Sequence, residues 1–203
     1  MDLHGHRPST IDDIDAVDKA RAQEYALLAT LLGRAPDAEL LSRLAALCGD
    51  PSPLGVAHAA LAEAARHATR EGVEREHFDL FIGLGRGVLL PYGSYYLTGS
   101  LQERPLARLR YELARLGIER SPGRAEPEDH AALLCEIMSG LVSGRLMVPR
   151  GADRAFFEAH LAPWMEKFFA DLERANAAEF YRSVGALGRV FMAVEAEAFA
   201  LSS

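Results

Sequence analysis

The sequence lacks any uninterrupted apolar run of the roughly 18 to 20 residues that cross a membrane. It has only two cysteines, Cys48 and Cys135, and no Cys-x-x-Cys spacing, so no disulfide framework and no cysteine-based zinc site is expected. Its 22 basic residues are outnumbered by 29 acidic ones, and the net charge of −7 argues against general binding to nucleic acid or to anionic membranes. We therefore expect a soluble cytoplasmic protein without stable membrane insertion, whose two thiols are buried and reduced.

The chain has 203 residues, of which 49% are hydrophobic, and this is enough for one domain with a sizeable core. Residues 1–14 contain no apolar run and predict a mobile N-terminal arm rather than a signal peptide. Residues 15–203 predict a single domain.

Apolar residues recur at spacings of three and four along most of the chain, which is the pattern of amphipathic helices. The expected helices cover residues 15–32, 37–48, 54–70, 73–84, 105–116, 126–143, 163–172 and 180–198, with shorter ones between them. No alternating run has the length of a β-strand. The sequence thus predicts an all-α, single-domain bundle of about nine to eleven helices.

Aromatic residues gather around a Gly- and Pro-rich break in the segment His77–Leu101. The glycines at 83, 85 and 87 do not form a dinucleotide-binding loop, because the next glycine of that motif would fall on Val88 and Pro91 prevents a long following helix. Phe78 is expected in the core. The tyrosines that follow the break combine apolar area with a polar tip, which suits a recognition surface.

The second distinctive stretch is EPEDH, residues 126–130. One interpretation is structural: Pro127 suits the first turn of a helix, and carboxylates are stabilised at the positive end of the helix dipole. That interpretation leaves His130 unexplained. If the helix begins at Glu126, that residue and His130 lie one turn apart and share a face, which would give a site able to hold a positively charged group.

Catalytic alternatives were weighed on the same residues. A zinc site on a helix needs two histidines one turn apart, and His130 stands alone. Ser94, Asp129 and His130 could form a nucleophilic triad, but Ser94 lacks the G-x-S-x-G elbow, and neighbouring helical residues point about 100° apart. No cofactor or metal is expected. A small hydrolase using His130 as a base, and a helical subunit that scaffolds a larger complex, remain as alternatives.

Three stretches together, PYGSYYLTGSL at 91–101, EPEDH at 126–130 and FFEAHLAPW at 156–164, resemble the TorD/DmsD/NarJ family of molybdoenzyme maturation chaperones. The resemblance implies an all-helical, cytoplasmic, non-enzymatic protein. Its partner would be the twin-arginine leader, or another terminal segment, of the catalytic subunit of a molybdopterin oxidoreductase. Binding would delay export until the cofactor is inserted.

The resemblance also implies which residues bind the leader. One wall of the peptide-binding groove would comprise Glu126, Pro127, Asp129 and His130, and the other Phe81, Pro91, Tyr92 and Ser94, flanked by Leu80 and Tyr96. Tyr92, where a tryptophan is common, and the GLGRG stretch leave open whether the client is of the dimethyl-sulfoxide or trimethylamine-N-oxide reductase type or of the formate dehydrogenase type. The sequence is compatible with a monomer and with a domain-swapped dimer.

Overall fold

A computed structural model describes residues 16–84, 87–119 and 126–201. This described part contains ten α-helices and two π-helical segments and no β-strand, which confirms the predicted all-α fold and its number of helices. The arm predicted for residues 1–14 lies outside the described residues.

The elements follow one another along the chain without long-range crossovers between sheets or subdomains. They are α1 (Ala16–Gly33), α2 (Ala38–Ala45), α3 (Pro53–His67), α4 (Arg70–His77), η1 (Phe78–Ile82), α5 (Gly93–Thr98), α6 (Arg104–Arg115), α7 (Ala131–Val142), α8 (Ala152–Phe156), η2 (Phe157–Leu161), α9 (Met165–Arg174) and α10 (Phe180–Leu201).

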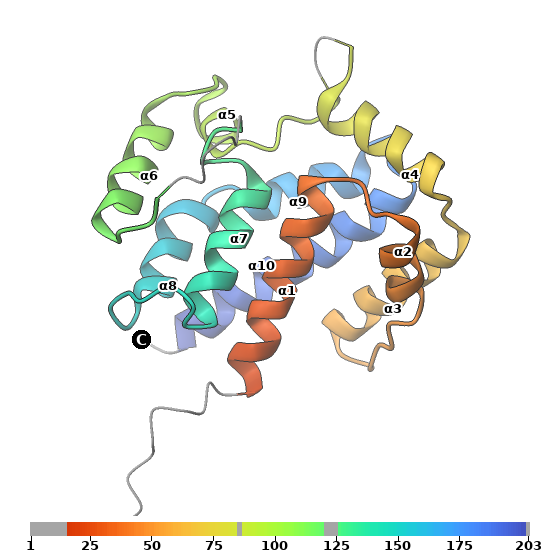
Figure 1. Ribbon diagram of the computed structural model, residues 1–203, viewed down its shortest axis with the longest axis horizontal. Helices are drawn as coiled ribbons and strands as arrows, with labels where there is room; N and C mark the ends of the chain where they lie inside the picture. Colours follow the sequence, from red (N-terminus) through yellow and green to blue (C-terminus); the bar gives the residue numbers. More distant parts are fainter. Residues whose placement is uncertain (1–15, 85–86, 120–125, 202–203) are drawn as a thin grey trace, which may run out of the picture.

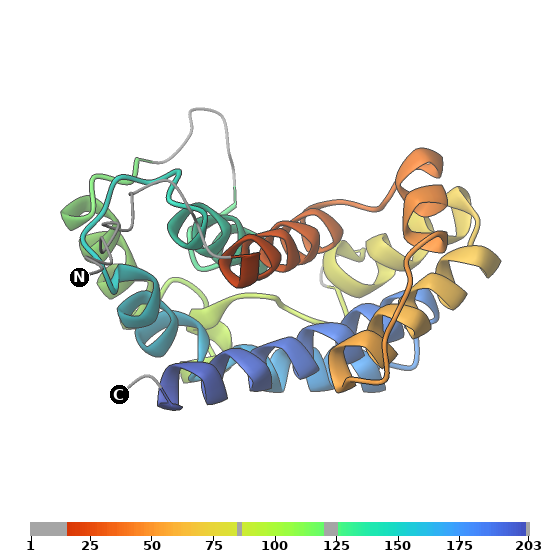
Figure 2. The same ribbon diagram turned by 90° about the horizontal axis from the view of Figure 1, so that it is seen from below.

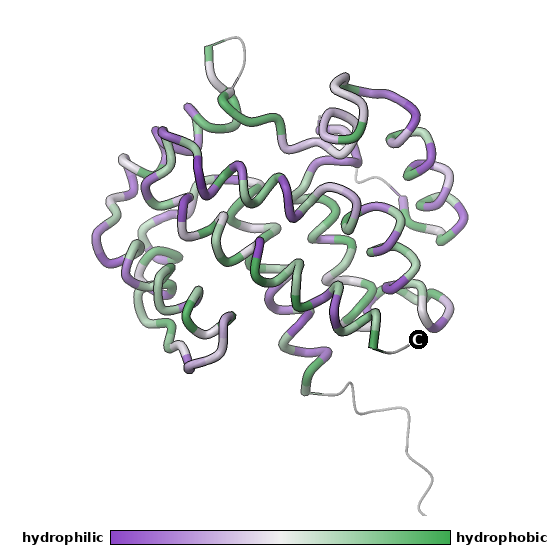
Figure 3. The backbone as a smooth tube through the Cα atoms, turned by 180° about the vertical axis from the view of Figure 1, so that it is seen from behind, coloured by the Kyte–Doolittle hydropathy of each residue, from purple (hydrophilic) through white to green (hydrophobic). Residues whose placement is uncertain are grey.

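Four helices form the centre of the molecule. The helix α1 packs along α7, and α10 packs along α9 and also contacts α3. Figure 2 shows the first pair lying over the second, so that the core is enclosed between two layers of helices. The helices α2 to α4 lie at one end of this centre, and α5 and α6 lie at the other (Figure 1). In Figure 3 the segment that leads from η1 to α5 is largely apolar, in agreement with its run of Val88, Leu89 and Leu90.

Short polar side chains fix where several helices begin. The Asp37 carboxylate accepts a hydrogen bond from the Leu40 N–H (2.9 Å), and the Ser52 hydroxyl accepts one from the Gly55 N–H (3.0 Å). Each satisfies a backbone donor that a helix start would otherwise leave unpaired.

Two glycines allow α10 to approach α9 closely. A Cβ atom added at Gly188 would lie 2.3 Å from the Phe169 ring, and one added at Gly185 would lie 2.5 Å from the backbone nitrogen of Glu173. Because α9 carries three fully buried aromatic or aliphatic side chains on this face, the close approach seals the core on that side. They are Phe168, Phe169 and Leu172.

Two helix boundaries differ from the predictions. The helix expected to run to Arg70 ends at His67, and α4 begins two residues later because the Thr69 hydroxyl accepts a hydrogen bond from the Gly72 N–H (3.1 Å). The helix expected to begin at Glu126 begins at Ala131. The backbone of residues 126–130 instead pairs with the segment before α5, and this prevents a helical conformation there.

Two burial predictions were also wrong. Cys135 is buried, but Cys48 is exposed, because α2 ends at Ala45 and leaves Cys48 in the following loop. Phe78 is 38% exposed. It begins the π-helical segment η1, whose wider turn breaks the 3.6-residue spacing on which its core assignment rested.

Candidate functional site

The two distinctive stretches of the sequence are joined through their backbones. Tyr92 and His130 form an isolated antiparallel bridge. Beside it, the Gly93 N–H donates to the Asp129 carbonyl (2.9 Å), and the Ala131 N–H donates to the Pro91 carbonyl (2.8 Å). The structure therefore brings Pro91, Tyr92 and Ser94 against Asp129 and His130, as the proposed groove requires.

Ser94 and Asp129 form the buried part of this junction. Ser94 is fully buried, and its backbone N–H donates to Asp129 Oδ2 (2.7 Å). Its hydroxyl oxygen accepts a hydrogen bond from the Gln102 N–H (3.2 Å). Asp129 is only 3% exposed, yet its second carboxylate oxygen, Oδ1, has no hydrogen-bond partner among the described residues. A buried carboxylate oxygen without a donor is unfavourable and calls for an explanation.

Tyr92, Glu126 and His130 form the outer part. The Tyr92 hydroxyl donates to the Glu126 carboxylate, and its ring meets the His130 ring edge-on with centroids 5.1 Å apart. Burial, followed by the Glu126 carboxylate, raises the pKa of Tyr92 above its ordinary value. His130 Nδ1 accepts a hydrogen bond from the Ala132 N–H (3.1 Å), so this histidine caps α7. Pro127 is half-buried beside it.

The remaining predicted residues have mainly packing contacts. The Tyr96 ring packs near those of Trp164 and Phe168, and its hydroxyl donates to Asp171 Oδ2 (3.2 Å), which connects α5 to α9. Leu80 is fully buried in the core. Phe81 meets the His77 and Tyr181 rings edge-on or nearly so, and so joins η1 to α10. Neither contact gives Leu80 or Phe81 a place at the Tyr92–His130 junction.

Asp129 lines a cavity of about 660 Å³ that extends under α6, which we call the Asp129 cavity. Its walls include Leu97, Leu109, Leu134 and Trp164, and on its far side His160 Nε2 lies 3.1 Å from Glu112 Oε2. Gly93 belongs to the wall because a Cβ there would lie 3.1 Å from Trp164 Nε1. An apolar hollow with a buried, incompletely paired carboxylate suits a side chain that is both long and positively charged.

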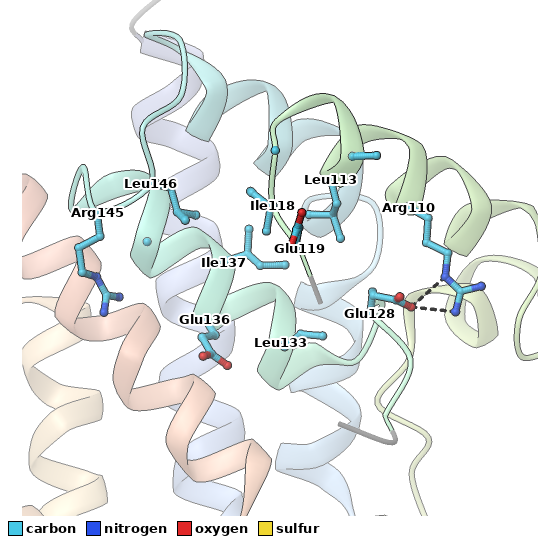
Figure 4. A pocket seen from close by; sticks show the side chains of 13 residues that line it. Arg110, Leu113, Ile118, Glu119, Glu128, Leu133, Glu136, Ile137, Arg145 and Leu146 are labelled. Carbon is cyan, nitrogen blue, oxygen red and sulfur yellow. Dashed lines mark hydrogen bonds and ion pairs between the residues drawn. The ribbon is translucent and has the colours of Figure 1, made fainter. Parts of the chain in front are cut away.

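The neighbouring residue Glu128 lines a different cavity, of about 640 Å³, on the other flank of α6 (Figure 4). We call it the Glu128 cavity. Its apolar wall consists of Leu113, Ile118, Leu133, Ile137 and Leu146. At one end Arg110 donates from Nε and Nη2 to Glu128 Oε2, both at 2.9 Å, and Arg145 lies at the opposite end (Figure 4).

The nucleophilic triad considered from the sequence is not assembled. In such a triad His130 Nδ1–H would donate to the aspartate. Here Nδ1 is the acceptor for the Ala132 N–H, and the Asp129 oxygen that is bonded receives the Ser94 backbone N–H instead. The Ser94 side chain is also fully buried.

Metal and membrane features were sought across the described ranges. In residues 16–84, 87–119 and 126–201, no group of three or more His, Cys, Asp or Glu side chains could hold a metal ion. Within the same ranges no helix has the length and apolar character needed to cross a bilayer.

Sequence reasoning missed the residues that α6 and η2 contribute to the two cavities. Arg110, Glu112 and His160 have no motif of their own, although His160 and Trp164 fall within the FFEAHLAPW stretch. Their partners are 18 and 48 residues away in the chain, which periodicity cannot reveal.

Residues 49–170, more than half of the chain and including both junction segments, match the family described as nitrate reductase delta subunit. The chain belongs to this family. The predicted resemblance is thereby confirmed, because the delta subunit family also includes relatives named as TorD chaperones.

Two curated relatives illustrate the likeness to the delta subunit family. The chaperone protein TorD of Vibrio cholerae serotype O1 (strain ATCC 39541) is 28% identical over 123 residues, which cover 56% of this chain and 56% of that protein. The chaperone protein TorD of Vibrio atlanticus (strain LGP32) is 26% identical over 146 residues, covering 65% of this chain and 68% of its own length. The chain thus spans about half the length of the Vibrio cholerae relative.

A solved structure supports the fold. The crystal structure of a protein assigned to redox enzyme maturation, from Archaeoglobus fulgidus, superposes with a TM-score of 0.60 and 20% identity, over 92% of this chain and 99% of that one. At this identity the likeness concerns the fold alone.

Proposed function

We propose that this protein is a non-enzymatic cytoplasmic chaperone that binds the twin-arginine leader, or another terminal segment, of the catalytic subunit of a molybdopterin oxidoreductase. By holding that segment it delays export until the cofactor has been inserted. The names of the curated relatives support the chaperone assignment.

The observation that carries the proposal is the unpaired Oδ1 of Asp129. This oxygen belongs to a carboxylate that is 3% exposed and lines a cavity with apolar walls. A guanidinium group supplies several N–H donors in one plane and keeps its charge at any physiological pH. An arginine of the leader would therefore satisfy Oδ1, while neighbouring apolar residues of the leader would contact Leu97 and Trp164.

The rest of the junction positions this carboxylate. The Ser94 N–H holds Oδ2, so that Oδ1 is left for the ligand, and His130 fixes the start of α7 directly after Asp129. Tyr92 and Glu126 form the outer edge, where a second cationic residue would meet Glu126. The net charge of −7 would speed the approach of a cationic segment and make binding weaken with salt.

Calorimetry with a synthetic leader from a molybdopterin oxidoreductase of the source organism tests the proposal. Asp129→Asn keeps an oxygen for the Ser94 N–H but removes the charge, and we expect affinity to fall about 10- to 100-fold, the loss of one charged hydrogen bond. Asp79→Asn, which makes the same change at an exposed residue of η1, should bind like the unmodified protein. Equal affinity of all three proteins would refute the assignment of the site.

A further inference from the structure

The Glu128 cavity has a boundary that can exchange its cation. The Glu128 side chain is 11% exposed, whereas that of Arg110, its ion-pair partner, is 52% exposed. The arginine can turn into water at small cost, but the carboxylate would then remain largely buried and without that cation. Such an asymmetric pair favours replacement of Arg110 by another cation over simple opening.

Behind this ion pair the cavity is apolar. Leu113 of α6 and Ile118 face Ile137 of α7 and Leu146 across the hollow (Figure 4). An open hollow of this kind gains from burying apolar side chains. At the far end Arg145 donates to the Ser139 and Ser143 hydroxyls, and its charge would repel a second cation there. The charges therefore set a direction, with a cationic end at Glu128 and an apolar continuation toward Arg145.

The two cavities meet at one turn of the backbone. Glu128 and Asp129 are consecutive, yet each lines a different cavity, with α6 between them. Leu113 and Ala114 of α6 face the Glu128 cavity, and Tyr111 and Glu112 face the Asp129 cavity. A peptide lying across the turn could place neighbouring cationic residues on both carboxylates.

We infer that the Glu128 cavity is a second subsite of the client-binding surface, occupied by the apolar part of the client segment after a client arginine has replaced Arg110 on Glu128. Arg110 is thus an internal competitor of the client and a determinant of its affinity. This inference rests on the proposed function, and it adds a residue pair and a cavity that the EPEDH motif and the aromatic segment do not include.

Arg110→Met tests the competition because it keeps the aliphatic stem and removes the guanidinium. The probe is a fluorescent synthetic peptide with two adjacent arginines before a stretch of leucines and alanines, measured by anisotropy. We expect Arg110→Met to tighten its Kd about threefold or more, and Glu128→Gln to weaken it about tenfold. Arg115→Met is the matched control. It removes the same charge from α6 outside the cavity and should change the Kd little.

A photoreactive benzoylphenylalanine in the apolar part of the same peptide tests the location. Crosslinks to Leu146 or Ile137, identified by mass spectrometry, are expected, and they should be lost when both peptide arginines are changed to glutamine. If the unmodified protein binds the peptide through Asp129, but Arg110→Met binds like Arg115→Met or the crosslinks fall outside the cavity, the second subsite is overturned and the proposed function stands. If the unmodified protein does not bind any leader, both fail.

Discussion

Two buried carboxylates at opposite sides of the molecule differ in how fully they are paired. Glu195 of α10 is 1% exposed, and both of its oxygens are bonded: Arg21 Nε donates to Oε1 (2.7 Å), and Arg21 Nη2 and the Tyr25 hydroxyl donate to Oε2 (2.8 and 2.9 Å). Asp129 is 3% exposed and has a donor on Oδ2 alone. Similar burial therefore accompanies two different environments.

The difference separates a structural charge from a binding charge. Glu195 joins α10 to α1 inside the packed centre, where every polar atom of the cluster helps hold two helices together. Asp129 lies where α5, α6 and the turn before α7 leave a cavity. An unpaired buried oxygen lowers stability, and its occurrence beside an apolar hollow indicates that a ligand supplies the missing donor.

The largest effect is expected from Glu195→Ala. It leaves the Arg21 guanidinium partly buried without its main partner, and we expect the free energy of unfolding to fall by about 3–5 kcal/mol. Denaturation by urea measures this, and Glu197→Ala at an exposed position of α10 should change it by less than about 0.5 kcal/mol. A small loss for Glu195→Ala would show that full pairing does not mark a structural carboxylate.

Glu76 provides a second fully used carboxylate, with an intermediate effect. Its oxygens accept hydrogen bonds from the Glu179, Phe180 and Tyr181 N–H groups (2.8, 3.0 and 2.7 Å), and so satisfy the first turn of α10 from α4. Glu76→Ala should lower the free energy of unfolding by about 2 kcal/mol. Glu74→Ala, which removes one exposed helical ion pair, is the control and should cost well under half as much.

The smallest effect concerns Glu24, a buried carboxylate that also has one oxygen without a partner among the described residues. Its other oxygen lies 2.9 Å from His58 Nε2, and this hydrogen bond raises the pKa of His58 despite partial burial. The pair therefore stabilises the fold fully below the unfolded pKa of about 6.5, and this contribution is lost as pH rises through the folded value.

Unfolding of the unmodified protein and of His58→Gln at pH 5.5 and pH 9 measures that contribution. The difference between the two proteins should be larger at pH 5.5, by less than about 1 kcal/mol. If Glu24→Gln also weakened leader binding as strongly as Asp129→Asn, an unpaired oxygen alone would not identify the binding charge.

The sequence predicted most helices because their apolar residues repeat with the helical period, as in α1 and α10. It also predicted that the Tyr92 and EPEDH segments meet. It misplaced the start of α7 because EPEDH has the composition of a first helical turn, whereas its backbone is engaged by Pro91 and Gly93. The cavities could not be predicted, since they depend on where α6 lies relative to Glu128 and Asp129, and no local pattern encodes that.

The most direct measurement is a double-mutant cycle between Asp129→Asn and replacement of each leader arginine by glutamine, followed by calorimetry. A guanidinium bound to Asp129 Oδ1 predicts that one of the two arginines couples to Asp129 by at least about 1.5 kcal/mol, while Glu24→Gln couples to neither. Coupling below about 0.3 kcal/mol for both arginines, in a protein that still binds the leader, would contradict the account.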